Sequence, residues 1–185
     1  MAILKIARMG HPVLRRKADP VADPTAPEIR RLVRDMVETM IDANGAGLAA
    51  PQVHVPLRLV VFQAPDGRSD PGLSEAERYD HTAPLTVLIN PELQVLAPDL
   101  EGGWEGCLSV PQMRGFVERP FHIRYRGVDH EGKPVERSAK GFHARVVQHE
   151  LDHLDGVLYP ERMGDLTKFI FESEAHHWAK RGDEE

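Results

Sequence analysis

The nine residues Gln148–Gly156 read QHELDHLDG, and the fold that we predict is built around them. His149 and His153 stand four positions apart, so in a helix both imidazoles leave the same face, one turn apart. Glu150 projects beside them. The stretch therefore predicts a helix that carries two metal ligands and a neighbouring acid–base group.

The residues around this stretch favour the helix. Gly156 supplies a helix end, Pro160 follows soon after, and we expect the helix to begin near Ala139. Taken alone, the pattern also fits two surface histidines beside a solvated glutamate. A catalytic divalent metal needs a third protein ligand and one open position, which the rest of the chain must provide. Apolar side chains recur at helical spacing at Phe142, Val146, Val147, Leu151 and Leu154.

The composition is that of an ordinary globular chain. Its 185 residues are 41% hydrophobic and 28% charged, which fits a single domain over residues 1–185 with a real core. No apolar run approaches the length of a membrane span, and residues 1–10 lack the hydrophobic stretch of a signal peptide. We therefore expect a cytoplasmic protein without a membrane partner. The net charge of −6 argues against direct nucleic-acid readout.

Cys107 is the only cysteine, so an intrachain disulfide is not possible. A lone cysteine is most often a small buried hydrophobe, and otherwise a nucleophile or a ligand. Gly106 before it and Pro111 after it indicate a strand edge or a bend. A thiolate in such a place is available as a metal ligand.

Residues 45–52, GAGLAAPQ, are a run of small side chains that lets backbone approach backbone or a ligand closely. The simplest structural interpretation is a tight turn that leads into a strand. The run lacks the Lys and Ser/Thr of a phosphate-binding loop. Gln52 is its informative residue, because a side-chain amide can donate to a developing oxyanion.

Periodicity predicts two further helices and several strands. Apolar residues repeat at helical intervals over roughly Pro27–Ala43, where Thr25 and Glu28 have the spacing of a capping box. Asp165–Lys180 reads as a final, partly docked helix, and Ala64–Pro84 as a long surface loop or short hairpin. The runs typical of strands are Leu57–Gln63, Leu85–Asn90, Glu92–Leu96, Phe116–Val117, His122–Val128 and Pro134–Ser138.

Three stretches together resemble the signature motifs of the peptide deformylases, GxGLAAPQ, EGCLS and QHExDHLxG. They read GAGLAAPQ at Gly45–Gln52, EGCLS at Glu105–Ser109 and QHELDHLDG at Gln148–Gly156, in the family's order. The resemblance covers nearly the whole chain and is weakest across Ala64–Pro84. We expect an α+β fold of mostly antiparallel strands around a central metal-binding helix, with an N-terminal and a C-terminal helix packed outside. The implied function is removal of the N-formyl group from the formyl-methionine of newly synthesised proteins, with release of formate.

The resemblance also implies a division of roles. Cys107, His149 and His153 would hold one divalent metal and leave a fourth position for water. Glu150 would take the proton of that water and later give it to the departing amine. The Gln52 side chain and the backbone N–H of Leu108 would receive the negative charge on oxygen. The family's usual metal is Fe²⁺, although the same ligands accept Zn²⁺, Ni²⁺ or Co²⁺.

The substrate implied by the resemblance is an N-formylated nascent peptide. It would lie extended near Gly47 and Gly106, in the manner of an added strand. The walls of the methionine pocket would include Ala46, Phe142 and Val146. Ribosome contact would be transient, and a monomer is the expected state.

Further positions support the site by resemblance, and three depart from the usual pattern. Glu105 and Arg119 would form an ion pair near the site, and Arg114 resembles the family's substrate-contacting arginine. The departures leave the chemistry intact and bear on side-chain preference; they are Ala46, Trp104 and Arg145.

Two other functions fit parts of the sequence. Zinc endopeptidases with an HExxH helix usually take their third ligand from downstream, as Glu or His. No residue after His153 completes their extended histidine-rich signature. A binding module in which Cys107, His149 and His153 only stabilise the fold is the second alternative, but a structural zinc site normally closes with four protein ligands.

Overall fold

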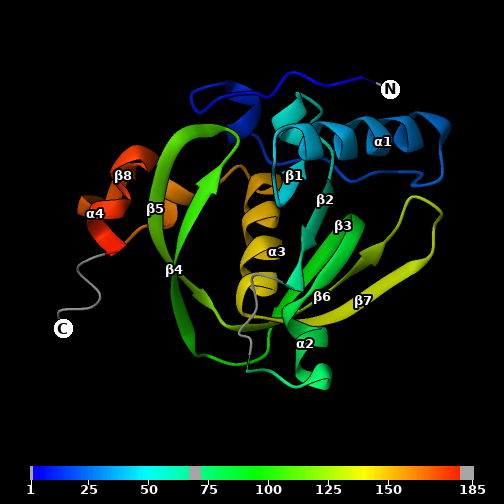
Figure 1. Cartoon of the computed structure of the whole chain (residues 1–185). Helices are drawn as coiled ribbons and strands as arrows, with labels where there is room; N and C mark the ends of the chain where they lie inside the picture. The colour runs from blue at the N-terminus through cyan, green and yellow to red at the C-terminus, as the bar shows by residue number, and fades with distance from the viewer. Residues whose placement is uncertain (1, 67–71, 180–185) are drawn as a thin grey trace.

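The computed structural model describes residues 2–66 and 72–179 and has an α+β architecture (Figure 1). Two antiparallel sheets, with strand orders β1-β2-β3-β6-β7 and β4-β5-β8, lie on either side of α3. Among the described residues, no helix combines the length and apolar character needed to span a bilayer. The helices are α1 Pro27–Asp42, α2 Glu75–His81, α3 Gly141–Leu154 and α4 His176–Ala179. The strands are β1 Gly47–Ala49, β2 Leu59–Ala64, β3 Ala83–Val95, β4 Leu100–Cys107, β5 Val110–Pro120, β6 His122–Val128, β7 Pro134–Lys140 and β8 Phe169–Phe171.

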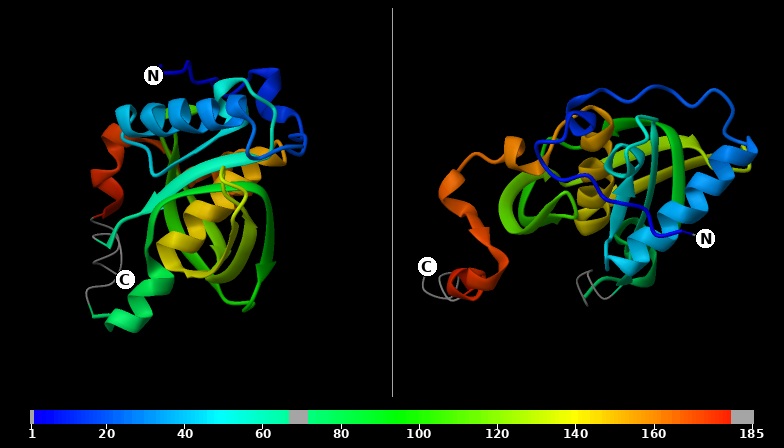
Figure 2. Two further views of the ribbon diagram at one scale, coloured as in Figure 1. Left: turned by 90° about the vertical axis from the view of Figure 1, so that its right-hand side faces the viewer. Right: turned by 90° about the horizontal axis from the view of Figure 1, so that it is seen from above.

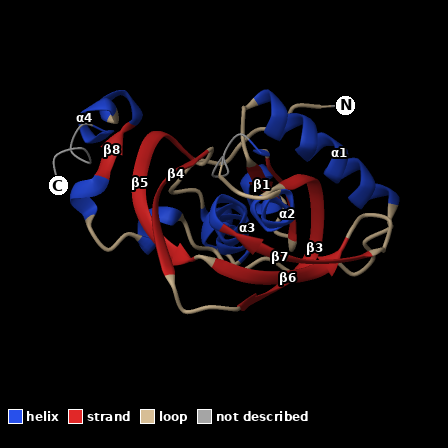
Figure 3. Cartoon of the chain, turned by 60° about the horizontal axis from the view of Figure 1, so that its bottom comes forward, coloured by secondary structure: helices blue, strands red, loops and turns tan. Residues whose placement is uncertain are grey.

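The predicted metal-binding helix is α3, and it is the centre of the molecule (Figure 3). Every residue of α3 except Phe142 and His149 is buried, including the polar side chains Gln148, Asp152 and His153. Buried polar groups need partners, so a central position of this helix requires hydrogen bonds for most of its polar side chains. The helix ends as predicted, because Gly156 adopts a φ of 77° just beyond it.

Strand β2 explains how the five-stranded sheet is covered on both faces. Val60 and Phe62 pack into the cluster that contains the apolar side of α3. Leu59 and Val61 alternate with them and pack into the cluster that contains α1. Because successive strand residues point to opposite faces, the apolar run Leu59–Phe62 fits a strand that is buried on both sides. The sheet therefore lies between α1 and α3.

Helix α1 follows the prediction at both ends, but its cap differs. It begins at Pro27, and Asn44 ends it in the left-handed region with a φ of 53°. The predicted capping box is wrong, since Ala26 is the N-cap and makes no side-chain cap bond. Thr25 is instead bonded to Asp23, 2.9 Å from its backbone N–H and 2.7 Å from its hydroxyl.

The C-terminal segment is the largest departure from the predicted secondary structure. The expected helix over Asp165–Lys180 is wrong over the described residues. The segment contains a 3₁₀ turn at Leu166–Lys168, the strand β8, a second turn at Glu172–Glu174 and only then α4. Strand β8 pairs with β5, so edge pairing overrides local helical periodicity (Figure 3). In the right-hand view of Figure 2, the orange and red C-terminal segment lies at one side of the molecule, away from α1. Lys180 lies outside the described residues.

The prediction of a long surface loop or short hairpin over Ala64–Pro84 is wrong for Glu75–His81, which forms α2. The helix has a capping box, in which Ser74 accepts from the Glu77 backbone and the Glu77 carboxylate accepts from the Ser74 backbone. That Ser-x-x-Glu signal was available in the sequence. The two strands predicted over Leu85–Asn90 and Glu92–Leu96 are one strand, β3, with an irregularity at Asn90.

Candidate active site

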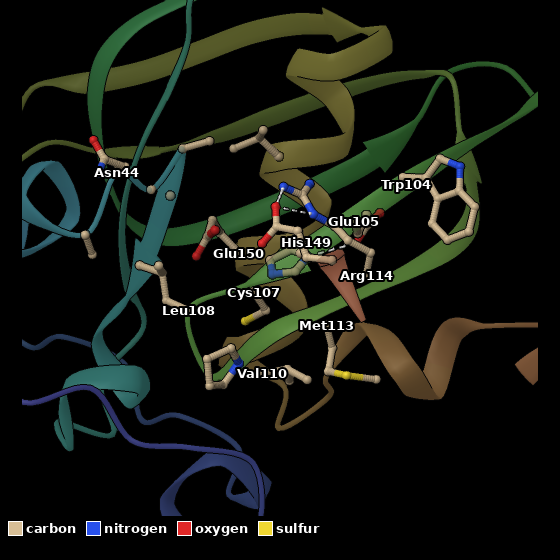
Figure 4. Close-up of a pocket in the computed structure, with 18 of the residues that line it drawn as sticks. Asn44, Trp104, Glu105, Cys107, Leu108, Val110, Met113, Arg114, His149 and Glu150 are labelled. Carbon is tan, nitrogen blue, oxygen red and sulfur yellow. Dashed lines mark hydrogen bonds and ion pairs between the residues drawn. The ribbon is translucent and has the colours of Figure 1, made fainter. Parts of the chain in front are cut away.

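Three elements distant in sequence bring the candidate residues together (Figure 4). The end of β4 supplies Cys107, α3 supplies His149 and His153, and the short 3₁₀ turn Ala50–Val53 supplies Gln52. One ligand atom from each of Cys107, His149 and His153 lies within 4.8 Å of the others. Cys107 Sγ and His153 Nε2 are 3.2 Å apart.

This donor set fits one divalent metal. His149 Nδ1 lies 2.8 Å from a Glu105 carboxylate oxygen, so the other ring nitrogen, Nε2, is left to bind the metal. Burial opposes ionisation of Cys107, but the His153 and His149 imidazoles hold the pKa of its thiol well below the ordinary value. The thiolate is the form that binds metals. A thiolate and two imidazoles form the three-ligand set of an open site, and this set does not select one metal ion.

Glu105 is the anchor of a buried ion network. Arg119 donates to both of its carboxylate oxygens, from Nε at 2.6 Å and from a terminal nitrogen at 2.9 Å. Arg119 also donates to Asp152 on α3 at 2.9 Å, and Arg162 donates to the same Asp152 carboxylate at 2.7 Å. Burial opposes ionisation of Glu105, yet Arg119 and His149 hold its carboxyl pKa well below the ordinary value. The predicted Glu105–Arg119 ion pair is confirmed.

Glu150 lies beside the ligand cluster with an unusual environment for a carboxylate. It is buried, and its Oε2 has no hydrogen-bond partner among the described residues. A Cβ added at Gly47 would lie 2.2 Å from its Oε1, so glycine is required where β1 passes this carboxylate. Burial raises the pKa of Glu150 to about 7, against the lowering effect of His149 and His153. The group is thus able to exchange a proton near neutral pH.

The Gln52 amide is held in one orientation. The Ala49 backbone N–H donates to its oxygen at 2.8 Å. Its nitrogen therefore faces the opposite way, 3.1 Å from the Ser109 hydroxyl and 3.6 Å from Cys107 Sγ. The amide nitrogen of Gln52 thus donates to the Ser109 hydroxyl and also faces Cys107, one of the three candidate metal ligands.

A cavity of about 510 Å³ opens onto Cys107, His149 and Glu150. Figure 4 shows Leu108 and Val110 on one side of it and Trp104 on another. The predicted substrate residues all line this cavity; they are Ala46, Gly47, Gly106, Arg114, Phe142 and Val146. Leu108 and Gln52 line it as well, whereas the predicted metal ligand His153 is buried and is not part of the cavity lining.

Some residues of the site were not foreseen. Glu172 also lines the cavity and accepts from Arg114 at 2.5 Å, although it lies 58 residues away in sequence. No sequence pattern predicts this ion pair, because it depends on the pairing of β8 with β5, in a segment where the sequence predicts a helix. Asp152 lies between the two histidines and is buried, where it accepts from Arg119 and Arg162. Its place in the histidine motif is the sequence signal that points to this supporting role. Ser109 stands inside the cysteine motif but was given no role.

Comparison with known proteins gives one consistent family. The family model described as polypeptide deformylase matches residues 3–169. Peptide deformylase 1 of Bordetella pertussis is 52% identical over 166 residues, which cover 89% of this chain and 89% of that protein. The crystal structure of peptide deformylase from Thermotoga maritima superposes with a TM-score of 0.76 at 34% identity, covering 89% of this chain and 100% of that one. A Met-Ala-Ser-bound class I type b peptide deformylase from Acinetobacter baumannii gives a TM-score of 0.75 at 34% identity, over 88% and 99% of the two chains.

Proposed function

The chain belongs to the peptide deformylase family, and from that premise we propose which of its residues remove the formyl group from the N-terminal formyl-methionine of new proteins. Cys107, His149 and His153 hold one divalent metal, with Fe²⁺ as the native ion. Glu150 carries the proton, and Gln52 with the Leu108 backbone N–H receives the oxyanion. The observation that carries this proposal is the close Cys-His-His cluster and, beside it, the buried Glu150 carboxylate, whose Oε2 has no hydrogen-bond partner among the described residues.

A bound divalent metal supplies Lewis acidity, which lowers the pKa of water and polarises a carbonyl oxygen. The protein's own part begins with Glu150, whose buried carboxylate accepts a proton from the attacking water. The same carboxyl group then donates that proton to the departing amine, so that formate and a free amino terminus leave. Its raised pKa suits both halves of this cycle.

Gln52 supports the proposed oxyanion role through its fixed orientation. The Ala49 N–H bond holds the amide oxygen away from the cluster, which leaves the amide nitrogen facing it. A donor already in place costs no reorganisation as charge develops on the formyl oxygen. Leu108 lines the same cavity, directly after Cys107. We therefore propose its backbone N–H as the second donor.

The peptide binds along β1 in this proposal. This strand is the last in its sheet, and among the described residues only β2 pairs with it, so its other edge can take an added strand. Gly47 on β1 and Gly106 on β4 stand on opposite sides of the peptide, and the methionine side chain enters between Ala46, Phe142 and Val146. The related Acinetobacter baumannii protein, whose crystal structure contains Met-Ala-Ser, supports a peptide of this kind.

The two alternatives receive less support. Endopeptidases of the HExxH kind usually take their third ligand from the chain after the second histidine, whereas the third donor in this cluster is Cys107, upstream on β4. A purely structural site would have no use for a buried carboxylate with an oxygen, Glu150 Oε2, that has no hydrogen-bond partner among the described residues. We further propose a single catalytic domain, a monomer in the cytoplasm and transient contact with the ribosome.

The test is formate release from formyl-Met-Ala-Ser by protein purified without oxygen and loaded with Fe²⁺. Acetyl-Met-Ala-Ser is the matched control, since it differs only in the acyl group. Rapid release of formate with little acetate supports the proposal. Cleavage within an unblocked peptide, without formate release, would establish the endopeptidase instead.

A further inference from the structure

Arg145 is a buried arginine on α3, one turn before His149, and it has no role in the mechanism above. Its side chain lines the cavity. A guanidinium in a protein interior is tolerated only when its donors find acceptors. Its partners therefore indicate what it does.

Those partners all lie on the hairpin of β4 and β5. One terminal nitrogen of Arg145 donates to Glu105 Oε1 at 2.9 Å and to the Val117 carbonyl at 2.8 Å. The other donates to the Glu101 carbonyl at 2.7 Å. A single side chain on α3 thus contacts β4 and β5 of the three-stranded sheet, and two of its acceptors are backbone atoms that cannot rotate away.

Gly103 provides the space that this arrangement needs. A Cβ added at Gly103 would lie 2.8 Å from Cζ of Arg145 and 2.9 Å from its Nε. Real Cβ atoms do not approach other heavy atoms so closely. The guanidinium therefore lies directly against the backbone of β4, and any side chain at position 103 would displace it.

This contact lies between the two elements that supply the metal ligands. Cys107 is at the end of β4, whereas His149 and His153 are on α3. Arg119 connects the sheet to α3 through Asp152, after His149, and Arg145 makes its connection before His149. The Glu105 carboxylate that Arg145 contacts is also the group that orients His149.

We propose that Arg145, seated in the space left by Gly103, is a positioning residue that sets the separation of β4 from α3 and with it the geometry of the Cys107, His149 and His153 ligand set. This inference rests on the proposed metal site. It predicts that changes at position 103 and at position 145 affect metal binding together, although neither residue touches the metal.

The experiment measures Ni²⁺ affinity by chelator competition and the visible spectrum of the Co²⁺-loaded protein, with melting temperature recorded alongside. The variants are Arg145→Ala, Arg145→Lys, Gly103→Ala and the double variant Gly103→Ala/Arg145→Ala. Gly127→Ala is the matched control. Its added Cβ would be equally crowded, 2.7 Å from the Ile89 carbonyl oxygen, but it stands on β6 in the other sheet.

We expect Arg145→Ala and Gly103→Ala each to weaken Ni²⁺ binding about tenfold and to shift the Co²⁺ absorption bands. Arg145→Lys should lose less Ni²⁺ affinity than Arg145→Ala, because lysine keeps the positive charge although it lacks the paired N–H donors of the guanidinium. The double variant should bind no more weakly than Arg145→Ala, since the added methyl group then meets no guanidinium. Gly127→Ala should lower the melting temperature and leave both metal measurements unchanged.

Wild-type affinity and spectra in Arg145→Ala and Gly103→Ala, with only the melting temperature lowered, would overturn the inference and leave Arg145 a packing residue. If Arg145→Ala does not fold, the Ni²⁺ affinity and Co²⁺ spectrum of Gly103→Ala and Arg145→Lys test the inference in the same way. Failure of the proposed function is distinguishable, because wild-type protein would then bind no stoichiometric Ni²⁺ or release no formate.

Discussion

Two histidines on α3, His143 and His149, occupy opposite environments within six residues. His143 is fully buried, where its Nδ1–H donates to the Asp80 carbonyl at 2.9 Å and its Nε2 accepts from the Tyr125 hydroxyl at 3.1 Å. His149 lies against the Glu105 carboxylate. Burial lowers the pKa of His143 to about 4, whereas Cys107 and Glu105 overcome burial and raise the pKa of His149 well above its ordinary value.

The difference teaches that the partner, more than the depth of burial, decides what a histidine on this helix can do. A carbonyl and a hydroxyl make His143 a neutral packing residue. A carboxylate orients His149 and raises its basicity as a donor. The N-terminal part of α3, around His143, therefore stabilises the fold, and we call it the structural end. The part that carries His149, Glu150 and His153 holds the site, and we call it the chemical end.

The largest effect is expected from Cys107→Ser, which removes a donor at the chemical end. A hydroxyl is a poor ligand where a thiolate is a good one. The affinity for Ni²⁺, measured by chelator competition, should fall by more than the roughly 10–100-fold typical of a change outside the ligand set. Wild-type affinity in this variant would show that Cys107 does not bind the metal.

Glu105→Gln should follow in size, because it removes the charge that orients His149 and leaves the buried Arg119 without its main partner. We expect metal affinity and kcat/KM to fall roughly 10–100-fold. Breaking such a buried pair also costs about 3–5 kcal/mol of unfolding free energy. Denaturant unfolding and single-substrate kinetics check the two effects. If activity is unchanged while stability falls, His149 does not depend on Glu105.

The structural end should show itself in acid stability. The pKa of His143 is about 4 in the folded protein and about 6.5 in the unfolded chain. Between these two pH values only the unfolded chain binds the proton. The contribution of neutral His143 to the unfolding free energy is therefore complete above about pH 6.5 and is lost as pH falls toward 4. The total is about 3 kcal/mol of unfolding free energy. Urea titrations at pH 7.5 and pH 5 should show a smaller loss in His143→Gln than in wild type.

The matched control for that measurement is His176→Gln, because His176 is an exposed histidine on α4. This variant should lose as much stability as wild type between the two pH values. An identical loss in His143→Gln would mean that other groups carry the acid sensitivity.

The smallest effect is expected at the rim of the cavity. Arg114 and Glu172 form an ion pair with side chains 38% and 55% exposed, which resembles the Glu105 network in chemistry but not in burial. Glu172→Gln should change the unfolding free energy by less than about 1 kcal/mol. Its effect should appear in KM for formyl-Met-Ala-Ser, by a few-fold, with kcat preserved. A larger loss of kcat would place Glu172 in the chemistry.

The sequence predicts the parts of the molecule whose signals are local. Helix α3, its end at Gly156 and the strand β6 follow from periodicity and motif, and the Cys-His-His set follows from spacing together with family resemblance. Helix α2 also has a local signal, the capping box of Ser74 and Glu77, so its start is predictable from the sequence as well.

The features that sequence could not predict depend on contacts between distant residues. Strand β8 exists because β5 offers an edge to Phe169–Phe171, which no local pattern reveals. Arg145 stands out in the sequence only as an unexpected residue, since its acceptors Glu101 and Val117 are 44 and 28 positions away. Burial turns such a residue into a determinant of the site, and burial is a property of the fold.

The central claim is that Glu150 moves the proton while three other residues hold the metal. The most direct test compares Ni²⁺-loaded wild type and Glu150→Gln, with metal content and formate release from formyl-Met-Ala-Ser measured on the same samples. We predict that the variant keeps one equivalent of metal and loses about 10²–10⁴-fold in formate release. Wild-type release by a fully loaded Glu150→Gln protein would contradict the assignment.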